Sequence, residues 1–188
     1  ALVLADKQSR ARQMNVGAAA ATGNILLFLH ADTRLPEGYD GLVRGALSQP
    51  RTAAGAFALG IDSPLPSLRI MEHVANWRSR FLQKPYGDQA IFLAAETYRT
   101  IGGYPDLPIM EDFELARRLK KKGRIIVLPA SVTTSARRWL HVGVWKTWFV
   151  NQATITAYLL GIAPGTIARF YNREKGITNK SLSRSGSR

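Results

Sequence analysis

The first residues that could do chemistry stand in LLFLHADTRLP (26–36), where an apolar run leads directly into His30 and Asp32. Side chains at i and i+2 can both reach one cation where the backbone is extended or turning. An imidazole and a carboxylate suit Mn²⁺ or Mg²⁺ held jointly with a diphosphate, because hard divalent ions prefer oxygen ligands and share them with phosphate. Alternatively, Asp32 caps the next helix or forms an Asx-turn with Thr33. The tripeptide alone leaves both interpretations open.

A second group of candidates is acidic. Glu111, Asp112 and Glu114 follow the glycine- and proline-rich loop GGYPDLP, at the start of a predicted helix. A helix N-terminus lowers carboxylate pKa values and keeps a base ionised at neutral pH. Such a base could take a proton from a hydroxyl nucleophile. Acids are also favoured at any helix start, and Asp is a good N-cap, so the pattern equally fits a structural role.

A third cluster is SARRW (135–139). Arg137 and Arg138 could clamp a phosphate while Trp139 stacks on a ring or sugar face. The same composition also fits surface charge beside a core tryptophan.

Two further segments carry polar groups at places a ligand could reach. In YGDQAIF (86–92), Gly87 allows close backbone approach, and Asp88 and Gln89 stand at the start of a predicted strand. Arg12 and Asn15, on the first predicted helix, offer phosphate or ribose contacts. Each of these side chains could instead be solvated.

These residues are positioned by alternating helical and strand-like segments. The pattern predicts helices at 6–23, 36–47, 67–82, 95–103 and 110–123, and strands at 24–29, 54–61, 89–94 and 124–129. Such alternation predicts an α/β domain with a largely parallel sheet. Ligands bind outside the carboxyl ends of strands in such sheets, which is where His30 and Asp32 are expected.

Composition limits the class of protein. The 188 residues fit one domain, and 46% of them are hydrophobic, enough for a core. Lys and Arg number 26 against 13 Asp and Glu, a net charge of +13 that favours anionic partners. The basic blocks at 116–124 and 169–188 could also be solvated faces. Without cysteine there are no disulfides or thiolate metal sites, which fits a reducing compartment.

The C-terminal part differs in composition. From Trp139 onward the chain is apolar and aromatic, which predicts either a helix docked on the domain or an amphipathic surface for a membrane. The predicted units are a catalytic-type domain at 1–139, this helical segment at 140–178, and a disordered basic tail at 179–188. The opening ALVLAD is typical of the end of a strand, so we expect that the N-terminal part of the natural domain is absent.

Together and in this order, the segments resemble family 2 glycosyltransferases of the GT-A fold, from about Lys7 to Trp139. RARQMNVGAAAATGNILLFLHAD is similar to the segment in which a helix with an N-x-G-x-x-x-A-x-G rhythm precedes a D-x-D motif, here H-A-D. IGGYPDLPIMED resembles the acceptor-side segment with its E-D pair. SARRW resembles Q-x-x-R-W, with Ser135 in place of Gln. HADT and GDQAIF are similar to runs of the bacterial subgroup "transferase 2, rSAM/selenodomain-associated".

The resemblance implies a Rossmann-like α/β/α sandwich with a mainly parallel sheet, and an inverting transferase. Asp32, with His30, would hold a divalent metal on the diphosphate of a UDP- or GDP-linked sugar. Asp112 would deprotonate a hydroxyl of the acceptor, and Glu111 would hold or tune that base. The acceptor would be a small molecule or a lipid-linked compound. His141 would be a remote candidate for a further metal ligand.

The resemblance also implies that SARRW touches the diphosphate or the acceptor. His30 in place of Asp lowers the negative charge of the metal site, and the loss of Gln argues against processive polymer synthesis.

The expected location is the cytoplasm, peripherally at the inner face of the membrane, and a homo-oligomer is left open. Two alternatives are a degenerate domain that binds a nucleotide-sugar without turnover, and a nucleic-acid binder supported by charge alone.

Overall fold

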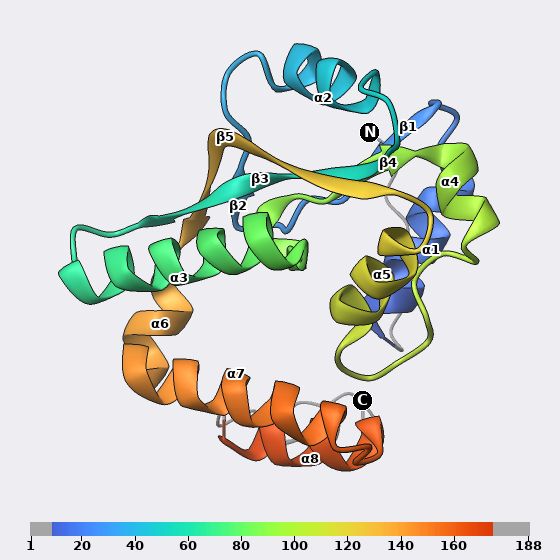
Figure 1. The fold of residues 1–188 in the computed structure, drawn as a ribbon. Coiled ribbons are helices and arrows are strands. Elements are labelled where there is room, and N and C mark those ends of the chain that lie inside the picture. The colour runs from blue at the N-terminus through green and yellow to red at the C-terminus, as the bar shows by residue number, and fades with distance from the viewer. Residues whose placement is uncertain (1–8, 175–188) are drawn as a thin grey trace, which may run out of the picture.

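The alternating segments form a five-stranded sheet with helices on both faces (Figure 1). This computed structural model describes residues 9–174, so the predicted tail at 179–188 lies outside the described residues. The strands are β1 Ile25–Leu27, β2 Thr33–Arg34, β3 Thr52–Asp62, β4 Phe92–Ala94 and β5 Arg124–Ser135. The helices are α1 Arg10–Ala20, α2 Tyr39–Leu47, α3 Pro66–Leu82, α4 Ala95–Thr100, α5 Glu111–Lys120, α6 Arg137–Val142, α7 Val144–Leu159 and α8 Pro164–Glu174, with a short 3₁₀ helix η1 at Gly87–Gln89.

The prediction of a mainly parallel sheet is wrong, because the sheet is mixed. Its order is β1-β4-β3-β5-β2, and of its neighbouring pairs only β3 and β5 run parallel. The other three pairs are antiparallel. The connection at residues 83–91 turns the chain so that β4 runs against β3, and β2 adds a two-residue edge. Helix–strand alternation does not reveal strand direction, and β1, β2 and β4 have only two or three residues each.

The first predicted helix and the first predicted strand both form, with bounds that differ from those predicted. Leu26 is buried in the core on one face of the sheet, while Ile25 and Leu27 pack against the core on the other, as expected for a strand covered on both sides. Ser9 is the N-cap of α1, with its hydroxyl accepting a hydrogen bond from the Arg12 N–H at 3.1 Å. The helix ends at Ala20, three residues before the predicted end at residue 23.

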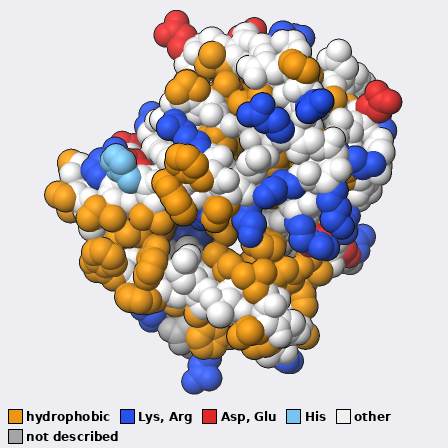
Figure 2. Space-filling model, viewed as in Figure 1, with side chains coloured by type: hydrophobic (Ala, Val, Ile, Leu, Met, Phe, Trp, Pro, Cys, Tyr) orange, Lys and Arg blue, Asp and Glu red, His pale blue; other side chains and the backbone are white. Residues whose placement is uncertain are grey.

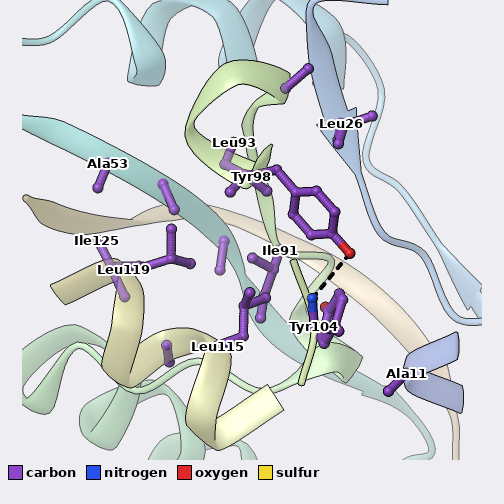
Figure 3. Packing of buried hydrophobic residues seen from close by; sticks show 14 residues of the cluster. Ala11, Leu26, Ala53, Ile91, Leu93, Tyr98, Tyr104, Leu115, Leu119 and Ile125 are labelled. Carbon is purple, nitrogen blue, oxygen red and sulfur yellow. Dashed lines mark hydrogen bonds between the residues drawn. The ribbon is translucent and has the colours of Figure 1, made fainter. Parts of the chain in front are cut away.

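The core beneath the sheet joins α1, α4 and α5 (Figure 3). Leu115 and Leu119 of α5 are fully buried there. Tyr98 of α4 and Tyr104 also lie in this cluster, and the Tyr104 N–H donates to the Tyr98 hydroxyl at 3.2 Å. Asn15 of α1 receives hydrogen bonds from the same hydroxyl at 2.5 Å and from the same N–H at 3.0 Å. This network fixes α1 against the loop that leads into α5.

Helix α3 completes the free edge of β3 with its side chains. The Asn76 side chain accepts from the Leu59 N–H at 2.7 Å and donates to the Leu59 carbonyl at 3.0 Å. The buried Glu72 carboxylate accepts from the Ile61 N–H. These side-chain bonds satisfy backbone groups of β3 that have no partner strand on this side, because β4 pairs with β3 only at Gly55.

The C-terminal helices form a separate layer below α3 and α5, with α7 and α8 side by side (Figure 1). Leu68 of α3 packs in a small core with Trp139 of α6 and Val144 of α7. No helix within residues 9–174 is both long enough and apolar enough to cross a bilayer.

Candidate active site

A cavity of about 410 Å³ lies between the start of α5, η1, the end of β5 and helices α7 and α8. It collects residues that are far apart in the sequence. Those predicted from the sequence that line it are His30, Asp32, Gly87, Asp88, Glu111, Asp112, Arg138 and Trp139. A second hollow of about 810 Å³ runs along β1 and shares His30, Asp32 and Gly87 with the first. The two spaces therefore meet at the H-A-D tripeptide.

Asp112, in the first turn of α5, is held by one carboxylate oxygen. Its Oδ2 accepts a hydrogen bond from the Arg10 guanidinium at 3.0 Å and from the Gly87 backbone N–H at 3.1 Å. Its Oδ1 is buried and has no hydrogen-bond partner within residues 9–174. A buried carboxylate oxygen without a partner costs free energy, so this oxygen is suited to receive a hydrogen bond from a ligand.

Arg10 lies at the centre of this arrangement, although it is not among the site residues predicted from the sequence. One guanidinium nitrogen lies 3.0 Å from Asp112 Oδ2, 3.3 Å from Glu111 Oε1 and 3.1 Å from His30 Nε2. Burial by itself would lower the pKa of Arg10, but the two carboxylates outweigh it and raise the pKa above its usual value. The site therefore contains a fixed positive charge between its acidic groups.

Helical periodicity could have identified Arg10 in place of Arg12. Met14, Ala18 and Ala21 pack on the core of the domain at helical spacing. Arg10 precedes Met14 by one turn and so shares that inward side, whereas Arg12 is two residues from Met14 and lies on another side.

Gly87 lets three functional groups meet at one point. A Cβ atom at this position would lie 2.7 Å from Asp112 Oδ2, 2.7 Å from His30 Nε2 and 3.0 Å from an Arg10 nitrogen. Real Cβ atoms do not approach other groups so closely, so any other residue would push these side chains apart. The backbone N–H of Gly87 also contributes directly, as a donor to Asp112.

Asp88 is a second acid beside the cavity. Its Oδ1 is buried and lacks a hydrogen-bond partner in the described part of the chain. Burial raises the pKa of Asp88, Asp112 raises it further, and the nearby Arg78 and His30 act in the opposite direction. The protonated form of Asp88 is thus favoured relative to an exposed carboxyl.

The predicted metal ligands are only partly gathered. Asp32 is exposed at the edge of the cavity, while His30 points its Nε2 at the Arg10 guanidinium. His141, on α6, is exposed and does not line the cavity. Among residues 9–174 no three His, Asp or Glu side chains come together as a metal site. Protein side chains alone therefore do not complete the predicted site, and a cation here would need oxygen ligands from a bound diphosphate as well.

The arginines of SARRW separate. Arg138 faces the cavity, where it donates to the Tyr171 hydroxyl at 2.5 Å and to Asn151 Oδ1 at 3.5 Å. Arg137 bonds the Ser135 hydroxyl and does not line the cavity. The C-terminal helices thus fix Arg138 over the site.

Three other predicted site residues do not line the cavity. Asn15 has its amide engaged with Tyr98 and Tyr104, and donates to the Tyr104 carbonyl at 2.8 Å. Gln89 is fully buried and donates to the Phe57 carbonyl at 3.0 Å. Arg12 is exposed on α1.

Comparison with known proteins gives matches among solved structures alone. No family model matches the sequence, and no curated protein matches it. A mannosyltransferase from Pyrobaculum calidifontis, solved with GDP-mannose and Mn²⁺, matches with a TM-score of 0.57 at 17% identity. The chain has a glycosyltransferase-like fold. The match covers 90% of this chain and 49% of the mannosyltransferase, so the chain spans about half of that protein's length. At this identity the likeness concerns the fold.

Proposed function

We propose that the chain carries the catalytic centre of an inverting glycosyltransferase, with residues 1–139 as its catalytic domain. The observation that carries this proposal is the Asp112 carboxylate, held by Arg10 and Gly87 through one oxygen and buried without a described partner at the other. The similarity of its motifs to family 2, and to the rSAM/selenodomain-associated subgroup, belongs to the same proposal.

In this mechanism Asp112 is the general base. Its Oδ1 accepts a hydrogen bond from the acceptor hydroxyl and takes the proton as the hydroxyl oxygen attacks the anomeric carbon. The bond between that carbon and the diphosphate oxygen breaks, and its electron pair leaves with the nucleoside diphosphate. Attack from the face opposite the leaving group inverts the anomeric centre. A positioned base contributes about 10²–10⁴-fold to such a step. Glu111 lies 3.3 Å from Arg10 and helps hold the guanidinium group that orients Asp112.

The donor is a UDP- or GDP-linked sugar. The hollow along β1 has an apolar floor that includes Leu26 and Phe28, and it meets the catalytic cavity at His30. Arg10 and Arg138 place positive charge where a diphosphate would lie between the two spaces. The structural neighbour's complex with GDP-mannose supports this donor class.

The proposal includes a divalent cation that the protein and the diphosphate would bind together. Asp32 would hold it together with the diphosphate, since carboxylate and phosphate oxygens suit Mn²⁺ and Mg²⁺. His30 is the weaker candidate because its Nε2 already faces Arg10 at 3.1 Å. When bound, the cation would supply Lewis-acid neutralisation of the leaving group.

The acceptor is a hydroxyl compound that enters from the side of α7 and α8. Asn151, Thr154 and Tyr171 line this part of the cavity with hydroxyl and amide groups, and Ile155 and Ala168 with apolar surface. This mixed lining suits a sugar-like hydroxyl attached to an apolar group, such as a lipid-linked acceptor met by the enzyme at the cytoplasmic side of a membrane.

The test is release of nucleoside diphosphate from a panel of UDP- and GDP-sugars with Mn²⁺, beside donor binding measured by thermal shift. We expect one donor class to stabilise wild type and to be turned over, and Asp112→Ala to bind the donor without turnover. Asp40→Asn, an exposed acid on α2, is the matched control and should keep full activity. Binding without turnover in wild type would favour the degenerate binding domain instead.

A further inference from the structure

Helix α3 carries a second apolar side that the fold does not use. Ile70, Val74, Trp77 and Phe81 follow one another at spacings that place them on one side of the helix, and each exposes 45–70% of its surface. The opposite side packs into the protein through Leu68, which is fully buried. A helix at a water-exposed surface normally carries polar residues on its outer side.

The exposed apolar surface continues onto the C-terminal helices. Trp145 and Phe149, one turn apart on α7, are 54% and 62% exposed. Helices α3 and α7 contact each other, and Figure 2 shows hydrophobic side chains over α3 and, below it, over α6 and α7. We name this surface the apolar band; it consists of Ile70, Val74, Trp77, Phe81, Trp145 and Phe149.

The segments that carry the band have almost no negative charge. Between residues 65 and 84 the single acid is Glu72, which is buried and paired with Arg69 at 2.9 Å. Residues 137–173 contain no Asp or Glu. The charges next to the band are therefore basic, such as the exposed Arg80 on α3.

The basic end of α5 borders the same surface. Lys120 donates a hydrogen bond to the Leu82 carbonyl at the end of α3, at 3.0 Å, and this contact joins the two helices. Lys121 and Lys122 follow it and are exposed. Figure 2 shows Lys and Arg side chains gathered over α5 beside the apolar side chains. The surface thus combines large aromatic and aliphatic groups with a positive border.

We propose that the apolar band docks on a bilayer that contains anionic lipid. Trp and Phe side chains of a surface helix insert at the level of the head groups, and lysines and arginines above them attract anionic lipids. A bilayer fits better than a second copy of the chain, because two copies facing each other would oppose their positive borders. In this proposal the helices lie on the surface of the bilayer. It does not depend on the proposed transferase activity.

The test is co-sedimentation of the full chain with vesicles of phosphatidylcholine alone or mixed with phosphatidylglycerol. We expect binding to the mixed vesicles, weakened by salt, and little binding to phosphatidylcholine alone. Trp77→Ser with Phe81→Ser should reduce the partition coefficient about tenfold or more, because two aromatic anchors are lost. Tyr39→Ser with Leu42→Ser is the matched control, since both are exposed apolar residues on α2, across the sheet, and should leave binding unchanged.

A second variant tests the charged border. Lys121→Gln with Lys122→Gln should lower binding to anionic vesicles several-fold and flatten its salt dependence. The proposal is overturned if folded wild type does not sediment with anionic vesicles, or if both aromatic and control variants bind as wild type does. It is also overturned if wild type dimerises in light scattering without lipid and Trp77→Ser with Phe81→Ser abolishes the dimer.

Discussion

Arg10 donates a hydrogen bond to Asp112 at 3.0 Å, although the two residues are 102 positions apart in the sequence. The contact joins the first turn of α1 to the first turn of α5. Two fold features make it possible: the Asn15 network, which fixes α1 against the loop before α5, and the absence of a side chain at Gly87. The packing of the surrounding segments thus fixes the positions of Asp112 and Arg10.

Replacing Arg10 should damage catalysis more than folding. Arg10→Ala removes the guanidinium that orients the Asp112 carboxylate, so kcat should fall roughly ten- to a hundredfold, equivalent to about 1.4–2.7 kcal/mol of transition-state stabilisation. Arg10→Lys should restore only part of the rate, since an ammonium cannot reproduce the planar fork. The exposed Arg12→Ala is the control and should keep its rate. Equal rates for the Arg10 and Arg12 variants would remove Arg10 from the mechanism.

Gly87→Ala should lower the transfer rate while leaving the protein folded. The added methyl would meet the ends of the Asp112, His30 and Arg10 side chains, which can move aside, and not backbone. We expect a loss of kcat of at least about tenfold, equivalent to about 1.4 kcal/mol of transition-state stabilisation, with a near-native thermal midpoint. Gly45→Ala on α2 is the control because a Cβ there meets nothing within 4 Å. Unchanged kcat in Gly87→Ala would contradict the crowding argument.

Asp88 should make the protein less stable as pH rises. Burial raises its folded pKa above the unfolded value, so the folded state keeps its proton to higher pH. This contribution is fully present below the unfolded pKa and is lost as pH rises through the folded pKa. Asp88→Asn should therefore increase the free energy of unfolding at neutral pH, with a smaller gain in acid. Urea titrations at several pH values measure the difference, and a pH-independent one would contradict this assignment.

Asp32 should control the metal requirement. Asp32→Asn removes the carboxylate that would share a cation with the diphosphate, so the Mn²⁺ concentration for half-maximal rate should rise at least about tenfold. His30→Gln should shift it less, because Arg10 already occupies the Nε2 side of His30. Mn²⁺ titrations of the initial rate compare the variants. The opposite ranking would make His30 the main protein ligand.

The sequence predicts α5 well because its signals are local. Acids in the first turn and bases in the last complement the helix dipole, and the helix runs from Glu111 to Lys120 as expected within the predicted segment. Asp112 is positioned by that local rule, which is why it could be proposed from sequence.

Other features depend on contacts between distant segments. The direction of β4 follows from the turn at 83–91, and β2 exists only because Thr33 and Arg34 pair with the end of β5. The structural use of Gln89 depends on the free carbonyl of Phe57. No local pattern contains this information. A mainly parallel sheet and a ligand role for Gln89 therefore fit the local sequence, although the packing of distant segments makes the sheet mixed and turns Gln89 to the Phe57 carbonyl.

The central claim is that Asp112 takes the proton from the acceptor, and Asp112→Asn tests it most directly. Asn keeps the shape of the side chain but cannot act as the base. Single-turnover transfer from a bound nucleotide-sugar should slow about 10²–10⁴-fold, while the donor Kd stays within a few-fold of wild type. Transfer at the wild-type rate by a correctly folded Asp112→Asn protein would contradict the account.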